Sequence, residues 1–327
     1  MASSLRSLLL ASARTLEGSG ADAPRLCAEL LLAKAMGCPR NTLLKRLIME
    51  PDCLAQQEVA ERFSAYVQRR AAGEPAAYIL GVKEFYGREF LVGPGVLIPR
   101  PETEGIIDLA LKYGRAGHAP LADCATHRAL THRALTQRAA TLSLACGSSS
   151  RPCFADFGSG SGCIGISLAL ELPDWQGLCL EKSAAAARIT HNNAQRLNAA
   201  VPVIRADFSA PPLAPCSLAL LVSNPPYVSL AEYQGLDREL HHEPQSALVP
   251  QALEDAPHGA TGLEAPLTII AQAERLLMPG GLLLMEIGCT QAQALLAALR
   301  GNMWSQAAVE RDLAGLDRIL RAVKAGP

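Results

Sequence analysis

The tetrapeptide Asn224-Pro225-Pro226-Tyr227 directly follows an apolar run and carries groups that could bind a planar amide or amine. Its two prolines lack backbone N–H donors and make the corner stiff. The Asn224 side-chain oxygen and the Pro225 carbonyl are two acceptors that match the two donors of an –NH₂ group, and Tyr227 offers a ring face for stacking. Holding both hydrogens would aim the nitrogen lone pair at an electrophilic methyl group. The predicted chemistry is therefore methyl transfer by positioning and electrostatics, and a rigid loop without chemistry is the alternative.

A second candidate site is the glycine-rich segment DFGSGSGCIG, residues 156–165, which follows an apolar strand and opens a helix. Glycines let the backbone turn sharply and approach a ligand closely, and the N–H groups at the helix start favour a negatively charged ligand group. A glycine pattern alone is a weak signal, because such turns also serve packing. The predicted cofactor-binding residues here are Asp156, Gly158, Ser159, Gly160, Ser161 and Gly162.

Three more polar or aromatic residues stand at the ends of later apolar runs. Glu181 follows at about the interval at which Rossmann-like folds place an acid on ribose hydroxyls. Asp207 and Phe208 close a third run and would flank an adenine ring, although a capping Asp and a core Phe are the alternative. Dinucleotide and adenosine-sulfonium cofactors both fit these residues. The position of Asn224 favours the second, because open α/β sheets bind ligands at the carboxyl ends of their strands.

The elements that must position these residues alternate between strand and helix from Arg151 onward. Apolar runs such as CFADFG, QGLCLEK, PVIRADF, LALLVSN and GLLLMEIG are separated by helical segments. This alternation predicts a parallel sheet with helices on both faces, completed by a helix and an edge strand near the C-terminus. Residues 1–75 carry apolar residues at helical spacing and predict a small bundle. Residues 83–99 alternate around Gly87 and predict a hairpin.

Composition excludes several classes of protein. Hydrophobic residues make up 49% of the 327 and charged residues 19%, which indicates a globular chain. A net charge of −1 gives no overall attraction to nucleic acid, and no apolar stretch approaches the length of a membrane span. The ten cysteines contain no CxxC pair, which favours mostly reduced thiols in the cytoplasm without a metal site or a disulfide framework. The N-terminus is transit-peptide-like, but its leucine spacing favours a first helix.

Several motifs in a fixed order resemble the HemK/PrmC family, the glutamine (N5) methyltransferases that modify peptide chain release factors. The segment at 73–104 contains IPRPETE, and DFGSGSGCIGISLA, NPPY, PGGLLLMEIG (279–288) and DLAGLDRILRA (312–322) follow it. The likeness extends to the N-terminal segment LCAELLLAKAMG and so covers nearly the whole chain. It implies an α/β fold with a Rossmann-like class I S-adenosylmethionine-dependent methyltransferase sheet and a small N-terminal helical bundle.

The resemblance also implies three domains and a reaction. A helical substrate-recognition domain would span 1–76, a β-hairpin linker 77–98, and the methyltransferase domain 99–327, with an insertion at about 114–151. S-adenosyl-L-methionine would donate a methyl group to the glutamine amide nitrogen in the Gly-Gly-Gln loop of a class I release factor. Asn224, Pro225, Pro226 and Tyr227 would orient that amide, and Asn224 would also lie at the cofactor. Arg100 would shape the substrate entrance. No metal, membrane or direct nucleic-acid contact is expected.

Two departures and three rival functions accompany the resemblance. Glu181 stands where the family usually has Asp, and the stretches at 114–151 and 250–264 are longer than expected. One rival is an amino-methyltransferase that acts on adenine or cytosine in DNA, which should show a basic recognition region. Methylation of a glutamine in another protein is a nearer alternative. A catalytically silent cofactor-binding module is the third, and the intact NPPY tetrapeptide argues against it.

Overall fold

The computed structural model describes residues 4–115, 151–251, 259–299 and 301–326. The predicted insertion at about 114–151 lies almost entirely outside these residues. The described chain divides into two compact units. Of the described residues, the first unit comprises 4–83, 92–94 and 236–243, and the second comprises 84–91, 95–115, 151–235, 244–251, 259–299 and 301–326.

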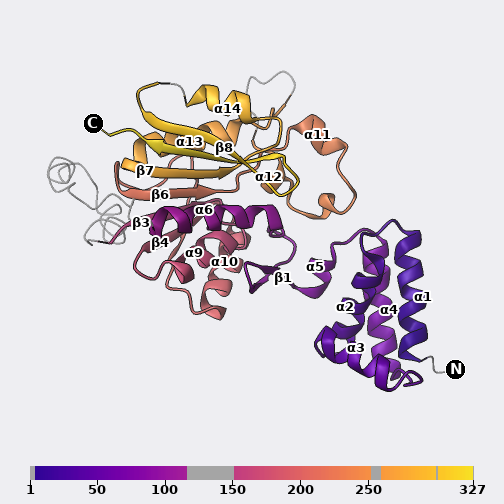
Figure 1. Ribbon diagram of the computed structural model, residues 1–327. Coiled ribbons are helices and arrows are strands. Elements are labelled where there is room, and N and C mark those ends of the chain that lie inside the picture. The colour runs from indigo at the N-terminus through magenta and orange to yellow at the C-terminus, as the bar shows by residue number, and fades with distance from the viewer. Residues whose placement is uncertain (1–3, 116–150, 252–258, 300, 327) are drawn as a thin grey trace. The chain divides into compact units, whose positions relative to one another are not determined.

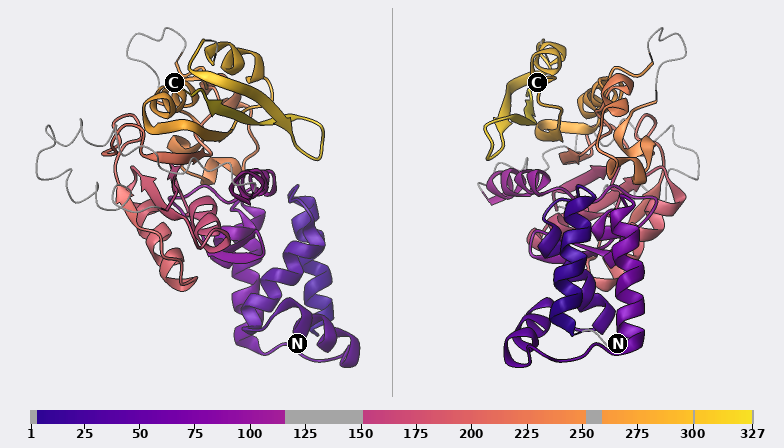
Figure 2. Two further views of the ribbon diagram at one scale, coloured as in Figure 1. Left: turned by 60° about the vertical axis from the view of Figure 1, so that its left-hand side comes forward. Right: turned by 90° about the vertical axis from the view of Figure 1, so that its right-hand side faces the viewer.

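The first unit is a helical bundle, as its apolar spacing predicts. Its helices are α1 (Leu5–Gly18), α2 (Pro24–Met36), α3 (Arg40–Met49), α4 (Gln57–Ala71) and the short α5 (Ala76–Leu80), with a 3-10 turn, η2, at Leu240–His242. The long helices α1, α2 and α4 lie side by side (Figures 1 and 2). They enclose a core that includes Leu16, Leu31 and Phe63. The helix α2 ends at Gly37, whose φ of 66° suits glycine.

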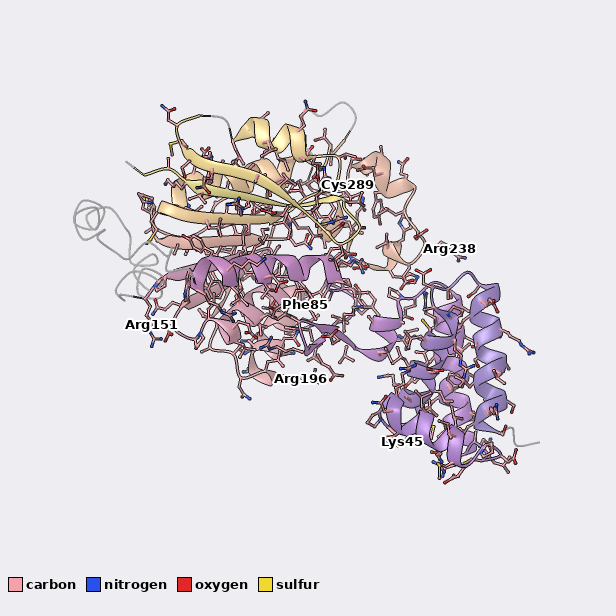
Figure 3. The ribbon with its side chains drawn as sticks, in the orientation of Figure 1. Lys45, Phe85, Arg151, Arg196, Arg238 and Cys289 are labelled. Atoms are coloured by element: carbon pink, nitrogen blue, oxygen red, sulfur yellow. The ribbon has the colours of Figure 1, made fainter. Side chains whose placement is uncertain are left out.

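The predicted hairpin forms where the chain passes from one unit to the other. Strand β1 (Val82–Phe85) pairs with β2 (Arg88–Leu91), and Tyr86 and Gly87 between them both have positive φ, at 50° and 71°. Two positive φ values are typical of the hairpin turn whose twist matches that of paired strands. Phe85, labelled in Figure 3, meets Phe90 edge to face with ring centroids 6.1 Å apart. Both rings are buried in the second unit.

A seven-stranded sheet in the order β5-β4-β3-β6-β7-β9-β8 forms the centre of the second unit. Its strands are β3 (Cys153–Phe157), β4 (Gln176–Glu181), β5 (Val203–Arg205), β6 (Leu218–Ser223), β7 (Leu277–Glu286), β8 (Trp304–Arg311) and β9 (Asp317–Lys324). The pairs among β3 to β7 are parallel, which confirms the α/β prediction. Strand β9 runs antiparallel to both β7 and β8.

Helices cover both faces of this sheet (Figures 1 and 2). One face packs on α6 (Glu104–Arg115), α9 (Cys163–Glu171) and α10 (Ala184–Arg196), and the other on α13 (Glu264–Leu276) and α14 (Ala292–Ala298). Alternate residues of each strand enter one core or the other; Phe154 and Leu220 enter the first, Ala155 and Leu221 the second. The remaining elements are short: η1 (Pro101–Thr103), α11 (Leu230–Gln234) and α12 (Gln245–Leu248).

Two expectations need correction, and a third agrees with the structure. The edge strand predicted near the C-terminus is β9, but β9 lies between β7 and β8, and the true edge β8 reads as a polar segment because one of its sides is open. The run PVIRADF forms a strand only at Val203–Arg205, so Asp207 and Phe208 lie beyond the strand end. Seven of the described cysteines are free, which agrees with the expectation of mostly reduced thiols.

Candidate active site

The glycine loop between β3 and α9 is braced by hydrogen bonds at nearly every residue. The N–H groups of Gly158 and Ser159 donate to the Leu180 carbonyl at 2.8 and 3.2 Å, and the Gly162 N–H donates to the Ser159 carbonyl at 2.7 Å. From α10, the Thr190 hydroxyl donates to the Gly160 carbonyl at 2.8 Å, and the Asn193 amide to the Ser161 carbonyl at 2.8 Å. The loop is therefore a preformed and rigid surface.

Glycine is required in this loop for two different reasons. Gly162 has a φ of 83°, and a Cβ there would stand 2.7 Å from both Ile166 and Thr190, so its hydrogen permits helix packing. Gly158 also has a positive φ, of 71°, but a Cβ there would meet no atom within 4 Å among the described residues. The positive φ by itself accounts for glycine at 158, and the space beside it is open among the described residues.

Asp156 lies directly beneath the loop and is fully buried. Its Oδ2 accepts a hydrogen bond from the Gly165 N–H at 2.9 Å, whereas its Oδ1 has no partner within the part of the chain that the structure describes. Burial raises the pKa of this carboxyl from 3.8 to about 7, against the Gly165 bond and with help from the nearby Glu181 charge. A buried acceptor without a partner costs free energy unless a donor arrives.

Glu181, the last residue of β4, is 9% exposed and holds the loop from the other side. One carboxylate oxygen, Oε2, accepts from the Gly160 N–H at 2.9 Å and the other, Oε1, from the Ser183 N–H at 2.7 Å. A carboxylate offers about four acceptor positions, so about two remain for a ligand. The Glu181 side chain, which is longer than the Asp usual in the family, is thus folded back onto the backbone at Gly160 and Ser183.

Asp207 and Phe208 follow β5 at the same edge of the sheet. The Asp207 carboxylate accepts from the Ser209 N–H at 2.9 Å and lies 2.9 Å from the Lys182 ammonium. Burial opposes its ionisation, but the Ser209 and Lys182 contacts outweigh that effect and lower the pKa. Phe208 is partly buried against the sheet core. Both residues thus have local roles, as a turn-capping Asp and a packed ring, and they follow Arg205, which pairs with Glu181.

The NPPY tetrapeptide leaves β6 after Ser223 and is fixed by side chains from three other segments. The Asn224 Nδ2 donates to the Thr103 hydroxyl at 3.2 Å, and the Tyr227 hydroxyl donates to Glu286 Oε1 at 3.0 Å. The Gln291 amide donates to the Tyr227 carbonyl at 2.9 Å. Burial, followed by the Glu286 charge, raises the pKa of Tyr227, so this residue stays a neutral hydroxyl donor.

A cavity of about 40 Å³ opens beside this tetrapeptide. It is lined by Leu97, Arg100, Asn224, Pro225, Tyr227, Val228, Ala247 and Leu248. On the same measure one water needs about 10–15 Å³, so the cavity has room for a group of a few heavy atoms. The cavity therefore matches a small planar group such as a carboxamide, and it places Arg100 next to three of the four NPPY residues.

Sequence reasoning missed two residues of this site. Thr103 in η1 and Glu286 at the end of β7 are each 1% exposed, and the Thr103 hydroxyl donates to Glu286 Oε2 at 2.6 Å. Both lie in motifs that carry the family resemblance, IPRPETE and LLLMEIG, but neither position suggests a contact across 183 residues. The sequence does offer one signal for Glu286. An acidic residue directly after the aliphatic run at 282–285 indicates a carboxylate at the end of a buried strand.

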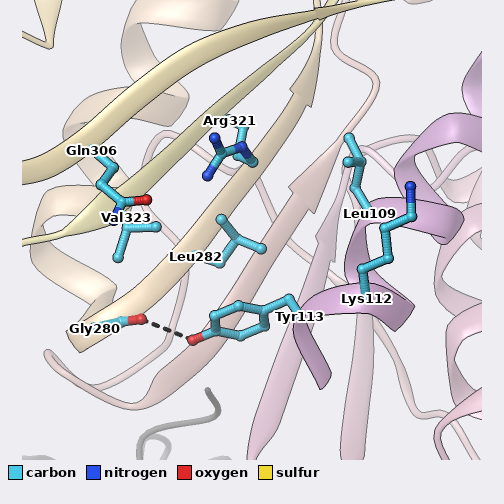
Figure 4. Close-up of a pocket in the computed structure, with 8 residues that line it drawn as sticks. All are labelled: Leu109, Lys112, Tyr113, Gly280, Leu282, Gln306, Arg321 and Val323. Atoms are coloured by element: carbon cyan, nitrogen blue, oxygen red, sulfur yellow. Dashed lines mark hydrogen bonds between the residues drawn. The ribbon is translucent and has the colours of Figure 1, made fainter. Parts of the chain in front are cut away.

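A larger pocket lies away from these residues. Its volume is about 590 Å³, and it is formed between α6, β7, β8 and β9 (Figure 4). The Tyr113 hydroxyl donates to the Gly280 carbonyl at 2.8 Å there, and burial raises the Tyr113 pKa to about 12. None of the residues that the sequence singles out for chemistry lines this pocket. Volume alone therefore does not locate the site.

The described residues contain neither a metal-binding cluster nor a membrane-spanning helix. No group of three or more His, Cys, Asp or Glu side chains there could hold a metal ion. No described helix is both long and apolar enough to cross a membrane.

Known proteins resemble this chain both in single domains and over nearly its full length. Residues 7–81 match the PrmC N-terminal domain and residues 139–251 the methyltransferase small domain. A solved SAM-dependent O-methyltransferase from Thermotoga maritima is 13% identical, with a TM-score of 0.39 over 59% of this chain and 67% of the other. The release factor glutamine methyltransferase of Moorella thermoacetica is 34% identical over 98% of both chains. That of Nitratidesulfovibrio vulgaris is 41% identical over 97% of this chain and 94% of its own. At that identity over nearly its full length, the chain belongs to the release factor glutamine methyltransferase family.

Proposed function

We propose that this methyltransferase moves a methyl group from S-adenosyl-L-methionine to the side-chain amide nitrogen of the glutamine in the Gly-Gly-Gln motif of a class I release factor. The observation that carries the proposal is the carboxamide-sized cavity lined by Arg100, Asn224, Pro225 and Tyr227. This cavity stands beside the glycine loop, because β3 and β6 are neighbours and Phe157 pairs with Ser223. The names of the family relatives supply the substrate class.

The described residues fit an adenosine-sulfonium cofactor on three counts. The unpartnered Asp156 Oδ1 suits the cofactor's ammonium group, and the open space beside Gly158 suits its methionine part. The acceptor positions left on Glu181 suit the two ribose hydroxyls. Asp207 and Phe208 would flank the adenine, and Ser159 to Gly162 complete the loop. When bound, the cofactor supplies an electrophilic methyl group.

The chain's own part in the reaction is to hold the amide. Asn224 Oδ1 and the Pro225 carbonyl accept its two N–H groups, Pro226 keeps the corner rigid, and Tyr227 packs against its plane. Because an amide nitrogen is a poor nucleophile, fixing both hydrogens and excluding water lowers the barrier through orientation and electrostatics. The proton that the product sheds can leave to solvent afterwards, so no general base is required.

The wider contacts of the substrate follow from the same proposal. The helical unit, residues 1–76, would help to grip the release factor, the 77–98 hairpin would link it to the methyltransferase domain at 99–327, and Arg100 would shape the entrance. Release factors act in the cytoplasm, and the seven free cysteines agree with a reducing compartment.

Mass spectrometry of a purified class I release factor, incubated with this protein and S-adenosyl-L-methionine, tests the proposal. We expect one methyl-sized mass gain on the Gly-Gly-Gln peptide. Asn224→Ala should remove it, because the amide then lacks one of its two acceptors, while cofactor binding measured by calorimetry stays within about twofold. Asn192→Ala, at an exposed position of α10, is the matched control and should retain full activity.

Two outcomes would overturn parts of the proposal. A folded, cofactor-binding protein that leaves the Gly-Gly-Gln peptide unmodified would refute the release-factor assignment. Incubation with other glutamine-bearing proteins and with DNA oligonucleotides would then separate the two remaining acceptors. Full activity of Asn224→Ala would instead refute the role of the tetrapeptide while leaving the substrate in place.

A further inference from the structure

Three linked hydrogen bonds, one buried and two partly buried, lie behind the NPPY tetrapeptide. Tyr227 and Thr103 each point their hydroxyl at Glu286, at 3.0 and 2.6 Å from its two carboxylate oxygens. The Thr103 hydroxyl also meets the Asn224 side chain at 3.2 Å. Thr103 and Glu286 are each 1% exposed, so bulk water competes little for the bond between them.

The direction of each of these hydrogen bonds follows from counting the protons that each group can donate. In the structure both hydroxyl groups donate to Glu286, Tyr227 to Oε1 and Thr103 to Oε2. Burial raises the pKa of Glu286, and an ionised Glu286 accepts hydrogen bonds and donates none, in keeping with these directions. A threonine hydroxyl has one proton, and Thr103 uses it on Glu286. In its contact with Asn224 the Thr103 hydroxyl can then act only as an acceptor. The group of Asn224 that faces Thr103 must therefore be its donor, Nδ2, which turns the acceptor Oδ1 the other way.

We propose that Thr103 and Glu286 are positioning residues that fix the orientation of the Asn224 amide, so that its oxygen and not its nitrogen faces the substrate. The inference rests on the proposed function, in which Asn224 accepts a hydrogen from the substrate amide. The two ends of an Asn side chain have nearly the same shape, so packing alone selects neither orientation. A reversed Asn224 would present donors to a donor, and the substrate nitrogen would lose one of its two acceptors.

Kinetics of three variants test the inference in the full-length protein. Thr103→Val keeps the shape of the side chain but removes the hydroxyl, so we expect kcat to fall by about tenfold to a hundredfold, the cost of one buried hydrogen bond of this kind. The KM for S-adenosyl-L-methionine should change less than twofold. Thr103→Ser retains the hydroxyl and should keep kcat within about threefold. Thr268→Val is the matched control, because it removes a hydroxyl that bonds only within α13, to the Glu264 carbonyl at 2.7 Å.

A second readout reports the amide orientation without any reaction. The chain contains six asparagines, so protein labelled with ¹⁵N-asparagine gives a sparse spectrum in which Asn224 is assigned by its loss in Asn224→Ala. In the wild type and in Thr103→Ser we expect one Asn224 Nδ2 proton to be shifted and protected from exchange by the bond to Thr103. In Thr103→Val that protection should disappear, while the buried Asn193 amide stays unchanged as an internal reference.

The two readouts separate failure of this inference from failure of the proposed function. Wild-type protein that does not methylate the release factor would refute the function, and the spectrum would still decide the orientation of Asn224. An Asn224 amide with the same shift and exchange rate in wild type and Thr103→Val would overturn the inference whatever the kinetics. Unchanged kcat in a folded Thr103→Val would also overturn it. If Thr103→Val does not fold, Thr103→Ala carries the same comparisons.

Discussion

Replacing Glu181 by glutamine tests whether the carboxylate that braces the glycine loop also holds the cofactor. In the wild type its two oxygens accept from the Gly160 and Ser183 N–H groups at 2.9 and 2.7 Å, and about two acceptor positions remain for the ribose hydroxyls. A glutamine has one oxygen and one NH₂ group. The NH₂ group must face either a backbone N–H or a ribose hydroxyl, and one acceptor is lost in either case.

The structure sets the size of the expected effect. Glu181 is 9% exposed, so solvent weakens its hydrogen bonds little. A hydrogen bond to a charged group contributes about 1.5–3 kcal/mol, and about 1.4 kcal/mol corresponds to a tenfold change in affinity. Losing one such bond should raise the Kd for S-adenosyl-L-methionine by roughly tenfold to a hundredfold. The product S-adenosylhomocysteine should weaken equally, because it shares the ribose, and kcat at saturating cofactor should change little.

Calorimetric titration of both ligands is the assay. Glu232→Gln is a suitable control, because Glu232 also accepts from a backbone N–H, that of Ser229 at 2.9 Å, but serves the capping of α11. A Kd for Glu181→Gln within twofold of the wild type, with an unchanged melting temperature, would show that Glu181 only braces the loop. A loss confined to one of the two ligands would contradict the assignment to the ribose.

Three further predictions follow from the same site. Gly162→Ala should destabilise the protein by about 1–3 kcal/mol in urea unfolding, because its Cβ would stand 2.7 Å from Ile166 and Thr190. Asp156 keeps its proton up to about pH 7 when folded but loses it above 3.8 when unfolded. The stability of the wild type relative to Asp156→Asn should therefore be greatest below about pH 4 and fall as pH rises toward 7, and an unchanged difference between pH 4.5 and 7 would contradict this burial argument. Arg100→Ala should raise the KM for the release factor several-fold with unchanged cofactor affinity, since Arg100 lines the cavity and not the glycine loop.

The parts of the site that could be predicted from the sequence are those that a single strand end carries. Gly158 to Gly162, Glu181 and Asn224 each follow an apolar run directly, and parallel strands bring such ends to one edge. The contact between Thr103 and Glu286 could not be predicted in this way. It joins a 3-10 turn before the sheet to the end of β7, and no local pattern encodes which turn meets which strand.

The C-terminal strands show a second limit of sequence reasoning. Strand β9 has buried residues along its length, such as Leu320 and Ala322, because it is flanked by β7 and β8. Strand β8, the edge, exposes Ser305, Gln306 and Ala307, so its composition does not distinguish it from a loop. Burial is decided by the neighbours that a strand acquires in the sheet, and an edge strand acquires few.

The strand order explains how one sheet edge can serve two ligands. From β3 the chain moves outward to β4 and β5, then returns to β6 on the other side of β3, so the loops after β3 and β6 leave from neighbouring strands. The pairing of Phe157 with Ser223 makes Gly158 and Asn224 the next residues on strands about 4.8 Å apart. The residues proposed to hold the cofactor therefore lie on the β3-β4-β5 side, and those proposed to hold the amide on the β6-β7 side. If these assignments are right, a backbone ladder sets the separation of methyl donor and acceptor, and side-chain substitutions at the surface of the site should not alter it.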